Sequence, residues 1–135
     1  MGMGEMRNSV NTGLKVLIVE DEAMITMLLE DMLTDLGHHV SGTSSRMSDA
    51  EVLVSKNEAD LAILDVNLAG QETYSLAQTL AARGVPFIFA TGYGTDGIRG
   101  NWPGVAVIQK PFQIRELAAA IEKSTSNLTP TISVP

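Results

Sequence analysis

The sequence predicts an α/β fold: a doubly wound, five-stranded parallel sheet with helices on both faces. Short apolar runs recur along the chain without alternation, as in strands that are buried on both faces of a parallel sheet. Segments with a helical spacing of apolar residues follow these runs, so that strand and helix alternate five times. The length of 135 residues suits one domain, and there is no internal repeat.

The first half of the chain predicts three strands and two helices. After the first strand, apolar residues stand at offsets 0, 3, 4, 7, 8 and 11 from Ile25, which is a strong helical period. Gly37 stands where a C-cap glycine belongs, and Ser48 or Asp49 is expected to cap the next helix. The expected strands are Lys15–Val19, His39–Thr43 and Asp60–Leu64, and the expected helices cover Ile25–Leu36 and Ser48–Lys56.

The second half predicts two more strands, two regular helices and one irregular crossing. A fourth helix should cross the sheet between Thr91 and Val105, but this segment holds five glycines and Pro103. An interior glycine costs a helix about 1 kcal/mol and a proline about 3. We therefore expect a short or irregular fourth helix, at most a turn or two near Thr95–Arg99. The other expected elements are helices Glu72–Arg83 and Gln113–Lys123 and strands Phe87–Ala90 and Val105–Ile108.

Composition and charge exclude several classes of protein. The chain has no cysteine, which excludes disulfides and thiolate metal sites, and its formal net charge of −7 argues against a nucleic-acid-binding surface. No apolar stretch approaches the roughly 18 residues that span a membrane, and the N-terminus lacks the pattern of a secretion signal. We expect a cytoplasmic protein with a flexible arm over residues 1–13, a folded domain over 14–123 and a disordered tail over 124–135.

Four of the apolar runs stop at polar residues that can bind phosphate or metal. These residues are Glu20, Asp21, Asp65, Thr91 and Lys110. Parallel strands share one carboxyl edge, where open α/β sheets bind ligands, so these side chains are expected to meet there. Each has an ordinary alternative as a helix cap, a turn former or a solvated residue. Their shared position at strand ends favours one chemical site.

The residue types indicate phosphoryl transfer assisted by a divalent cation. Close carboxylates repel one another at neutral pH, and a bound cation offsets that cost. A ligand set made only of oxygen favours Mg²⁺ over zinc or copper. In this interpretation Asp65 is the nucleophile, Lys110 meets a phosphoryl oxygen as a point charge and Thr91 donates a hydrogen bond.

Four motifs resemble the signatures of the receiver domain of bacterial two-component response regulators. They are Val-Glu20-Asp21-Glu, Ile-Leu-Asp65-Val-Asn67-Leu, Phe-Ala-Thr91-Gly-Tyr93 and Lys110-Pro111-Phe112. The resemblance covers about residues 14–123, and the third motif is similar to the one that defines the FAT GUY subgroup. This resemblance implies a flavodoxin-like sheet in the order 2-1-3-4-5 and a cis peptide bond before Pro111.

The same resemblance implies a role for each site residue. Asp65 would be phosphorylated by a sensor histidine kinase, with Mg²⁺ held by Asp21, Asp65 and the carbonyl of Asn67, and with Glu20 acting through water. The chain would then be no enzyme with a separate substrate, because it would only take up and lose its own phosphoryl group. Its partners would be the kinase and a histidine phosphotransfer protein or a downstream effector, and neither nucleic acid nor a membrane.

The chain also departs from the receiver pattern. Most receivers carry an aromatic residue three positions before the lysine, where this chain has Val107, so the usual switch between threonine and aromatic residue cannot operate. Many relatives have Pro and Gly in the loop after the acceptor, where this chain has Ala69 and Thr73. We hypothesise that Tyr93 and the glycine-rich segment after Thr91 carry the output instead.

Three other functions compete with this interpretation. Gly92-x-Gly94-x-x-Gly97 matches a dinucleotide-binding fingerprint, but it follows the fourth strand and not the first, and it opens no convincing helix. A small aspartyl-phosphate phosphatase would place a second Asp two residues after its nucleophile, where this chain has Asn67. A protein-binding module that uses the receiver fold without phosphorylation stays open as the third alternative.

Overall fold

The computed structural model describes residues 13–93 and 97–126, and it contains a five-stranded parallel sheet. The strands lie in the order β2-β1-β3-β6-β7, which in chain order is the expected 2-1-3-4-5. Their bounds are β1 Lys15–Val19, β2 His39–Ser44, β3 Leu61–Asp65, β6 Phe87–Thr91 and β7 Ala106–Gln109. The predicted fold class is therefore confirmed.

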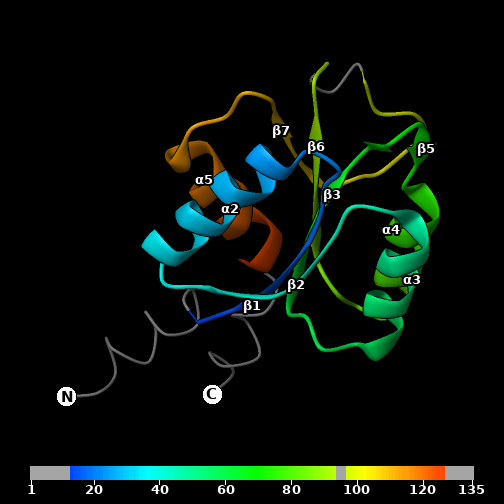
Figure 1. The fold of residues 1–135 in the computed structure, drawn as a ribbon, viewed down its shortest axis with the longest axis horizontal. Helices are drawn as coiled ribbons and strands as arrows, with labels where there is room; N and C mark the ends of the chain where they lie inside the picture. Colours follow the sequence, from blue (N-terminus) through cyan, green and yellow to red (C-terminus); the bar gives the residue numbers. More distant parts are fainter. Residues whose placement is uncertain (1–12, 94–96, 127–135) are drawn as a thin grey trace.

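Helices cover both faces of the sheet. One face carries α2 (Ala23–Asp35) and α5 (Ile114–Thr125), and the opposite face carries α3 (Met47–Lys56) and α4 (Tyr74–Ala82) (Figure 1). This arrangement is the doubly wound sandwich, in which the loops at the carboxyl ends of the strands are left free to form a site. No helix in the described part of the chain is long and apolar enough to cross a membrane.

The strands are buried from both sides because adjacent residues point to opposite faces of the sheet. Ile63 of β3 belongs to an apolar cluster with Leu29 of α2 and Leu117 of α5. Its neighbour Leu64 belongs to the cluster on the other face, together with Leu80 of α4. All residues of β3 and β6 are buried, which is why these strands appear in the sequence as continuous apolar runs.

A short hairpin after β3 was not predicted. β4 (Asn67–Leu68) and β5 (Gln71–Glu72) pair in antiparallel fashion, with Asn67 opposite Glu72. The two turn residues, Ala69 and Gly70, have φ angles of 52° and 91°, and positive values at both positions are what a type I′ hairpin turn requires. Ala-Gly is not the usual Asn-Gly signal, so the turn was missed. The expected start of the next helix at Glu72 was therefore wrong, and α4 begins at Tyr74.

Other element ends differ from the prediction by small amounts. Neither Ser48 nor Asp49 caps α3, because the helix begins at Met47 and its N-cap is Arg46, which makes no side-chain capping bond. α5 begins with a reciprocal capping box and continues to Thr125, two residues beyond the expected end. Apart from Gly13 and residues 124–126, the expected arm and tail lie outside the described residues, so their disorder stays a prediction.

The crossing between β6 and β7 contains no α-helix in its described parts, residues 92–93 and 97–105. Part of the turn expected near Thr95–Arg99 lies outside the described residues. In place of a helix, Trp102 covers this part of the sheet: its ring stacks on Tyr74, with centroids 5.9 Å apart, and meets Phe89 edge-on at 5.4 Å. Its indole N–H donates to the Arg99 carbonyl at 3.0 Å.

Candidate functional site

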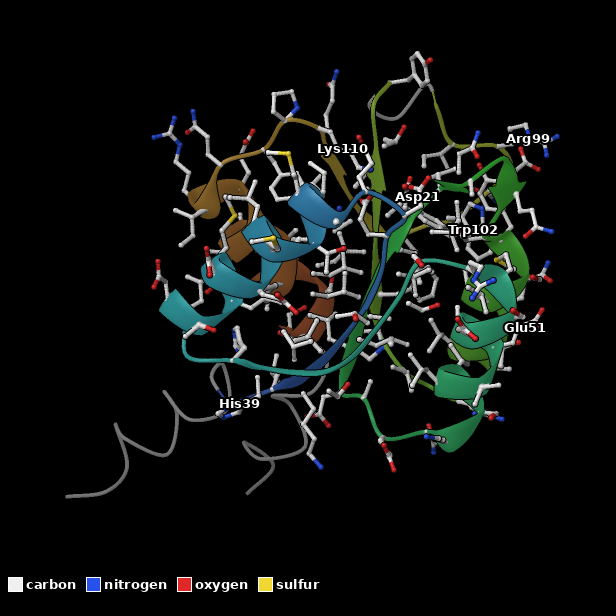
Figure 2. The ribbon with its side chains drawn as sticks, in the orientation of Figure 1. Asp21, His39, Glu51, Arg99, Trp102 and Lys110 are labelled. Carbon is white, nitrogen blue, oxygen red and sulfur yellow. The ribbon has the colours of Figure 1, made fainter. Side chains whose placement is uncertain are left out.

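The polar residues at the strand ends meet at the carboxyl edge of the sheet. Glu20 and Asp21 follow β1, Asp65 ends β3, Thr91 ends β6 and Lys110 follows β7. One carboxylate oxygen from each of the three acids lies within 4.8 Å of the other two. Asp21 and Lys110 lie close together at this end, whereas His39 lies at the opposite end of the molecule (Figure 2).

Lys110 makes ion pairs with three carboxylates. Its Nζ lies 2.8 Å from Glu20 Oε1, 3.2 Å from Asp65 Oδ2 and 3.9 Å from Glu22 Oε1. Burial alone lowers the pKa of Lys110, but the pairs with Glu20 and Asp65 outweigh it and raise the pKa, so the ammonium stays charged. The Lys110–Pro111 peptide bond is cis, as the family resemblance implies.

Asp65 is a buried carboxyl in a negative environment. Burial, followed by the charge of Glu20, raises its pKa to about 7, although Lys110 acts in the opposite direction. Glu20 is itself only 3% exposed. Three carboxylates thus face one ammonium, and a divalent cation is the simplest way to balance their charge. All of these donor atoms are oxygens, which fits Mg²⁺.

Asp21 and Asn67 are tied to the β4–β5 hairpin. The exposed Asp21 accepts the backbone N–H of Ala69 at 3.2 Å through Oδ2. It does not cap α2, because the N-cap of that helix is Glu22 and makes no side-chain capping bond. Asn67 donates its backbone N–H to Asp65 Oδ1 at 3.2 Å, and its side-chain oxygen accepts the N–H of Gly70 at 2.8 Å.

Thr91 lies buried beside the acids and faces the segment that follows it. Its hydroxyl oxygen accepts the backbone N–H of Tyr93 at 3.1 Å, while the Tyr93 side chain is 80% exposed. A Cβ atom at Gly97 would lie only 2.4 Å from Thr91 Oγ1, so this close contact requires glycine. Thr91 also accepts the backbone N–H of Lys110 at 2.9 Å through its carbonyl, which links the ends of β6 and β7.

Two residues of the site were not predicted from the sequence. Glu22 reaches Lys110, and only its place after Glu20-Asp21 could have indicated this. Thr73 donates its hydroxyl to the backbone carbonyl of Asp65 at 2.7 Å. The sequence shows Thr73 only as a departure from the family pattern, since the unpredicted β4–β5 hairpin brings it back to the acceptor.

Known proteins share this fold and these motifs. The profile of the response regulator receiver domain matches residues 16–122. The chain is 32% identical to the transcriptional regulatory protein PdtaR of Mycobacterium tuberculosis over 116 residues, which cover 83% of this chain and 57% of PdtaR. It therefore spans little more than half of that relative's length.

Solved structures give the same result. SdrG from Sphingomonas melonis Fr1 has a TM-score of 0.75 and 40% identity, covering 82% of this chain and 95% of SdrG. Its BeF3-activated conformation has a TM-score of 0.70. The receiver domain of sensor histidine kinase PA1611 from Pseudomonas aeruginosa, with a TM-score of 0.73 and 26% identity over 85% of this chain and 99% of that domain, coordinates a magnesium ion in its active-site cleft. With its strand-end acids, its lysine and a family match over residues 16–122, the chain belongs to the response regulator receiver domain family.

Proposed function

We propose that this receiver domain accepts a phosphoryl group on Asp65 from the phosphohistidine of a sensor histidine kinase. The phosphorus–nitrogen bond of the donor breaks, its electrons stay on the departing imidazole, and a phosphorus–oxygen bond forms to an Asp65 carboxylate oxygen. The observation that supports this most is the Lys110 ammonium 3.2 Å from that carboxylate. Asp65 would act only on its own phosphoryl group, so no separate substrate is proposed.

Mg²⁺ is the cofactor that the site residues fit. We infer that Asp21, Asp65 and the carbonyl of Asn67 would hold the ion and that Glu20 would act through water. When bound, Mg²⁺ neutralises charge on the phosphoryl oxygens. The chain supplies the remaining contacts: the Lys110 ammonium pairs with one phosphoryl oxygen, and the Thr91 hydroxyl, whose oxygen is held by the Tyr93 N–H, donates a hydrogen bond.

A hollow of about 440 Å³ lies at the carboxyl edge beside α2, and its lining includes Glu20, Asp21 and Met27. We infer that a donor imidazole approaches the acids from this side. The proposed partners are a sensor histidine kinase and a histidine phosphotransfer protein or downstream effector that contacts the phosphorylated form. A cytoplasmic location stays a prediction from the sequence.

The segment after Thr91 is proposed to carry the output, because Val107 cannot serve as an aromatic switch. Arg99 connects this segment to the acceptor side: its Nε donates to Glu72 Oε2 at 3.0 Å, and its backbone N–H donates to the Tyr74 hydroxyl at 2.7 Å. A shift of Thr91 toward a phosphoryl group would therefore displace Gly97, Arg99 and the start of α4.

Intact-mass measurement tests the phosphorylation. Incubation with acetyl phosphate and Mg²⁺ is expected to add the mass of one phosphoryl group, labile to alkali, and Asp65→Asn is expected to add none. The absence of any gain in the wild type, or an equal gain in Asp65→Asn, would refute the proposal. Asp65→Asn cannot be phosphorylated at this position. A kinase-binding assay with this variant therefore tests the alternative, a module that binds its partner without phosphorylation.

Trp102 provides the readout for the output segment because it is the only tryptophan. Addition of beryllofluoride and Mg²⁺ is expected to change its fluorescence. In Arg99→Ala the change should shrink, while beryllofluoride affinity stays the same, because the pair with Glu72 is lost without touching the acceptor. Unchanged fluorescence in the wild type at saturating beryllofluoride would contradict a role for this segment.

A further inference from the structure

Thr73 is a buried polar residue at the junction of the hairpin and α4, and it lies against the acceptor. Its side chain is fully enclosed, with 0% relative exposure. The hydroxyl donates to the Asp65 carbonyl at 2.7 Å and also lies 3.4 Å from the Val66 carbonyl. The backbone N–H of Thr73 donates to that Val66 carbonyl at 3.0 Å. Thr73 therefore holds the two peptide units that follow the phosphoacceptor.

The hydroxyl of Thr73 serves the acceptor strand and not the helix that begins beside it. Threonine at the N-cap of a helix normally accepts a backbone N–H of the first turn through its side chain. Thr73 is the N-cap of α4 but makes no side-chain capping bond. Only its backbone carbonyl serves α4, by accepting the N–H groups of Leu76 and Ala77. Stabilisation of the helix does not explain where the hydroxyl points.

The peptide that Thr73 holds sets the geometry of the phosphoacceptor. On its other side, the N–H of Val66 donates to the Ala90 carbonyl at 3.0 Å, so this peptide is fixed between β6 and Thr73. The next N–H, that of Asn67, donates to Asp65 Oδ1 at 3.2 Å. A rotation of the peptide would turn both the Asp65 carboxylate and the Asn67 backbone, and a change of about 1 Å in such a site costs much of its function.

We propose that Thr73 is a positioning residue for the Asp65 site: its hydroxyl holds the Asp65 carbonyl and so fixes the carboxylate and the Asn67 backbone for Mg²⁺ and the phosphoryl group. The inference rests on the proposed function of Asp65. Thr73 touches neither the ion nor the reacting atoms and acts only through the backbone that it holds.

Calorimetric titration with Mg²⁺ tests this, with isosteric variants of the full chain. Thr73→Val keeps the shape and removes the hydroxyl, and loss of such an outer hydrogen bond typically weakens metal affinity about 10- to 100-fold. We expect the Mg²⁺ affinity of Thr73→Val to fall by about tenfold, and the initial rate of phosphorylation by acetyl phosphate at fixed Mg²⁺ to fall with it. Thr73→Ser keeps the hydroxyl and is expected to stay near the wild type.

Thr125 provides a matched control. It is also a buried threonine, 1% exposed, whose hydroxyl donates to a backbone carbonyl, that of Ile121 at 2.7 Å, but it lies in the last turn of α5. Thr125→Val is expected to lower the urea midpoint of unfolding as Thr73→Val does, and to leave Mg²⁺ affinity unchanged. If Thr73→Val does not fold, Thr73→Ala removes the same hydroxyl without adding a methyl group, and the same loss of affinity is expected.

The outcomes separate this inference from the function on which it rests. Wild-type Mg²⁺ affinity in folded Thr73→Val would overturn the positioning role and leave the function of Asp65 intact. An equal loss in Thr73→Ser would overturn it too, because the hydroxyl would then not be the cause. A wild-type chain that neither binds Mg²⁺ nor gains a phosphoryl group would overturn both.

Discussion

The two ends of the sheet bury titratable groups in opposite ways. At the carboxyl end, Asp65 and Glu20 are both nearly buried and share the Lys110 ammonium, so charge is held where burial disfavours it. At the amino end, His38 is also buried, but it accepts the backbone N–H of Leu14 through Nδ1 at 3.3 Å and is held neutral.

This difference distinguishes the carboxyl end of the sheet, which holds the candidate site, from the amino end, whose buried groups only stabilise the fold. The carboxyl end also holds Ala69 in a left-handed backbone conformation, φ 52°, which costs a residue with a Cβ about 1 kcal/mol. A buried neutral histidine with a hydrogen-bond partner carries no comparable penalty near neutral pH. The paired acids and Ala69 thus place destabilising features beside Asp65, as is common at functional sites.

The largest effect is expected from Lys110→Met, which leaves two buried carboxylates without their ammonium. Breaking a buried ion pair on one side costs about 3 kcal/mol or more, so the free energy of unfolding at pH 8 should fall by about that amount. Urea unfolding measures it. Because Mg²⁺ can replace part of the missing positive charge, saturating Mg²⁺ should reduce the loss. A loss below about 0.5 kcal/mol, as for a surface pair, would show that the carboxylates are solvated.

Asp65→Asn is expected to stabilise the fold at high pH. Asp65 has a pKa of about 7 in the folded chain and 3.8 ordinarily, so above pH 7 folding disfavours the charged form. Partial contact with water reduces the effect to about 2 kcal/mol. As the pH falls from 7 toward 4, the folded wild type takes up the proton and the penalty disappears. Urea unfolding at pH 8 and pH 5 should show a gain for Asp65→Asn that narrows at pH 5.

Much of the carboxyl end could be predicted from the sequence because each residue follows its own strand. Glu20 and Asp65 directly end an uninterrupted apolar run, Lys110 follows one after Gln109, and the parallel order alone brings such ends to one edge. Thr73 and Arg99 could not be found in this way. Thr73 reaches Asp65 through an unpredicted hairpin, and Arg99 lies in a crossing whose glycines carry no periodic signal.

The expected cap of α3 was wrong: Ser48 is a good N-cap type, but α3 begins one residue earlier, at Met47. Asp21 also suits an N-cap, but a distant contact holds it instead. The Asp21 carboxylate accepts the N–H of Ala69, which is 48 residues away. A local pattern cannot record such a partner, whereas the capping box of Gln113 and Glu116 involves only neighbours.

His38 tests the other end of the comparison. Burial, followed by the charge of the neighbouring His39, lowers the pKa of His38, so the folded chain resists protonation. Stability contributed in this way is present above the ordinary value of 6.5 and is lost as the pH falls below it, opposite in sign to Asp65. Between pH 7 and pH 5, the free energy of unfolding of His38→Gln should fall less than that of the wild type. The difference between the two chains should be smaller than the change that Asp65→Asn causes. An identical pH dependence in both chains would contradict a buried neutral histidine.

The smallest effect is expected at the hairpin turn, where adjacent residues provide opposite tests. Ala69→Gly removes the penalty of a left-handed alanine and should raise the free energy of unfolding by about 0.5 kcal/mol after the greater freedom of glycine in the unfolded chain is counted. Gly70→Ala should lower it by a similar amount, because φ at Gly70 is 91° although no atom lies within 4 Å of an added Cβ. Urea midpoints measure both. If both substitutions changed the free energy of unfolding in the same direction, the turn would not hold this backbone in solution. The hairpin could then no longer fix Asp21 or Thr73 beside Asp65.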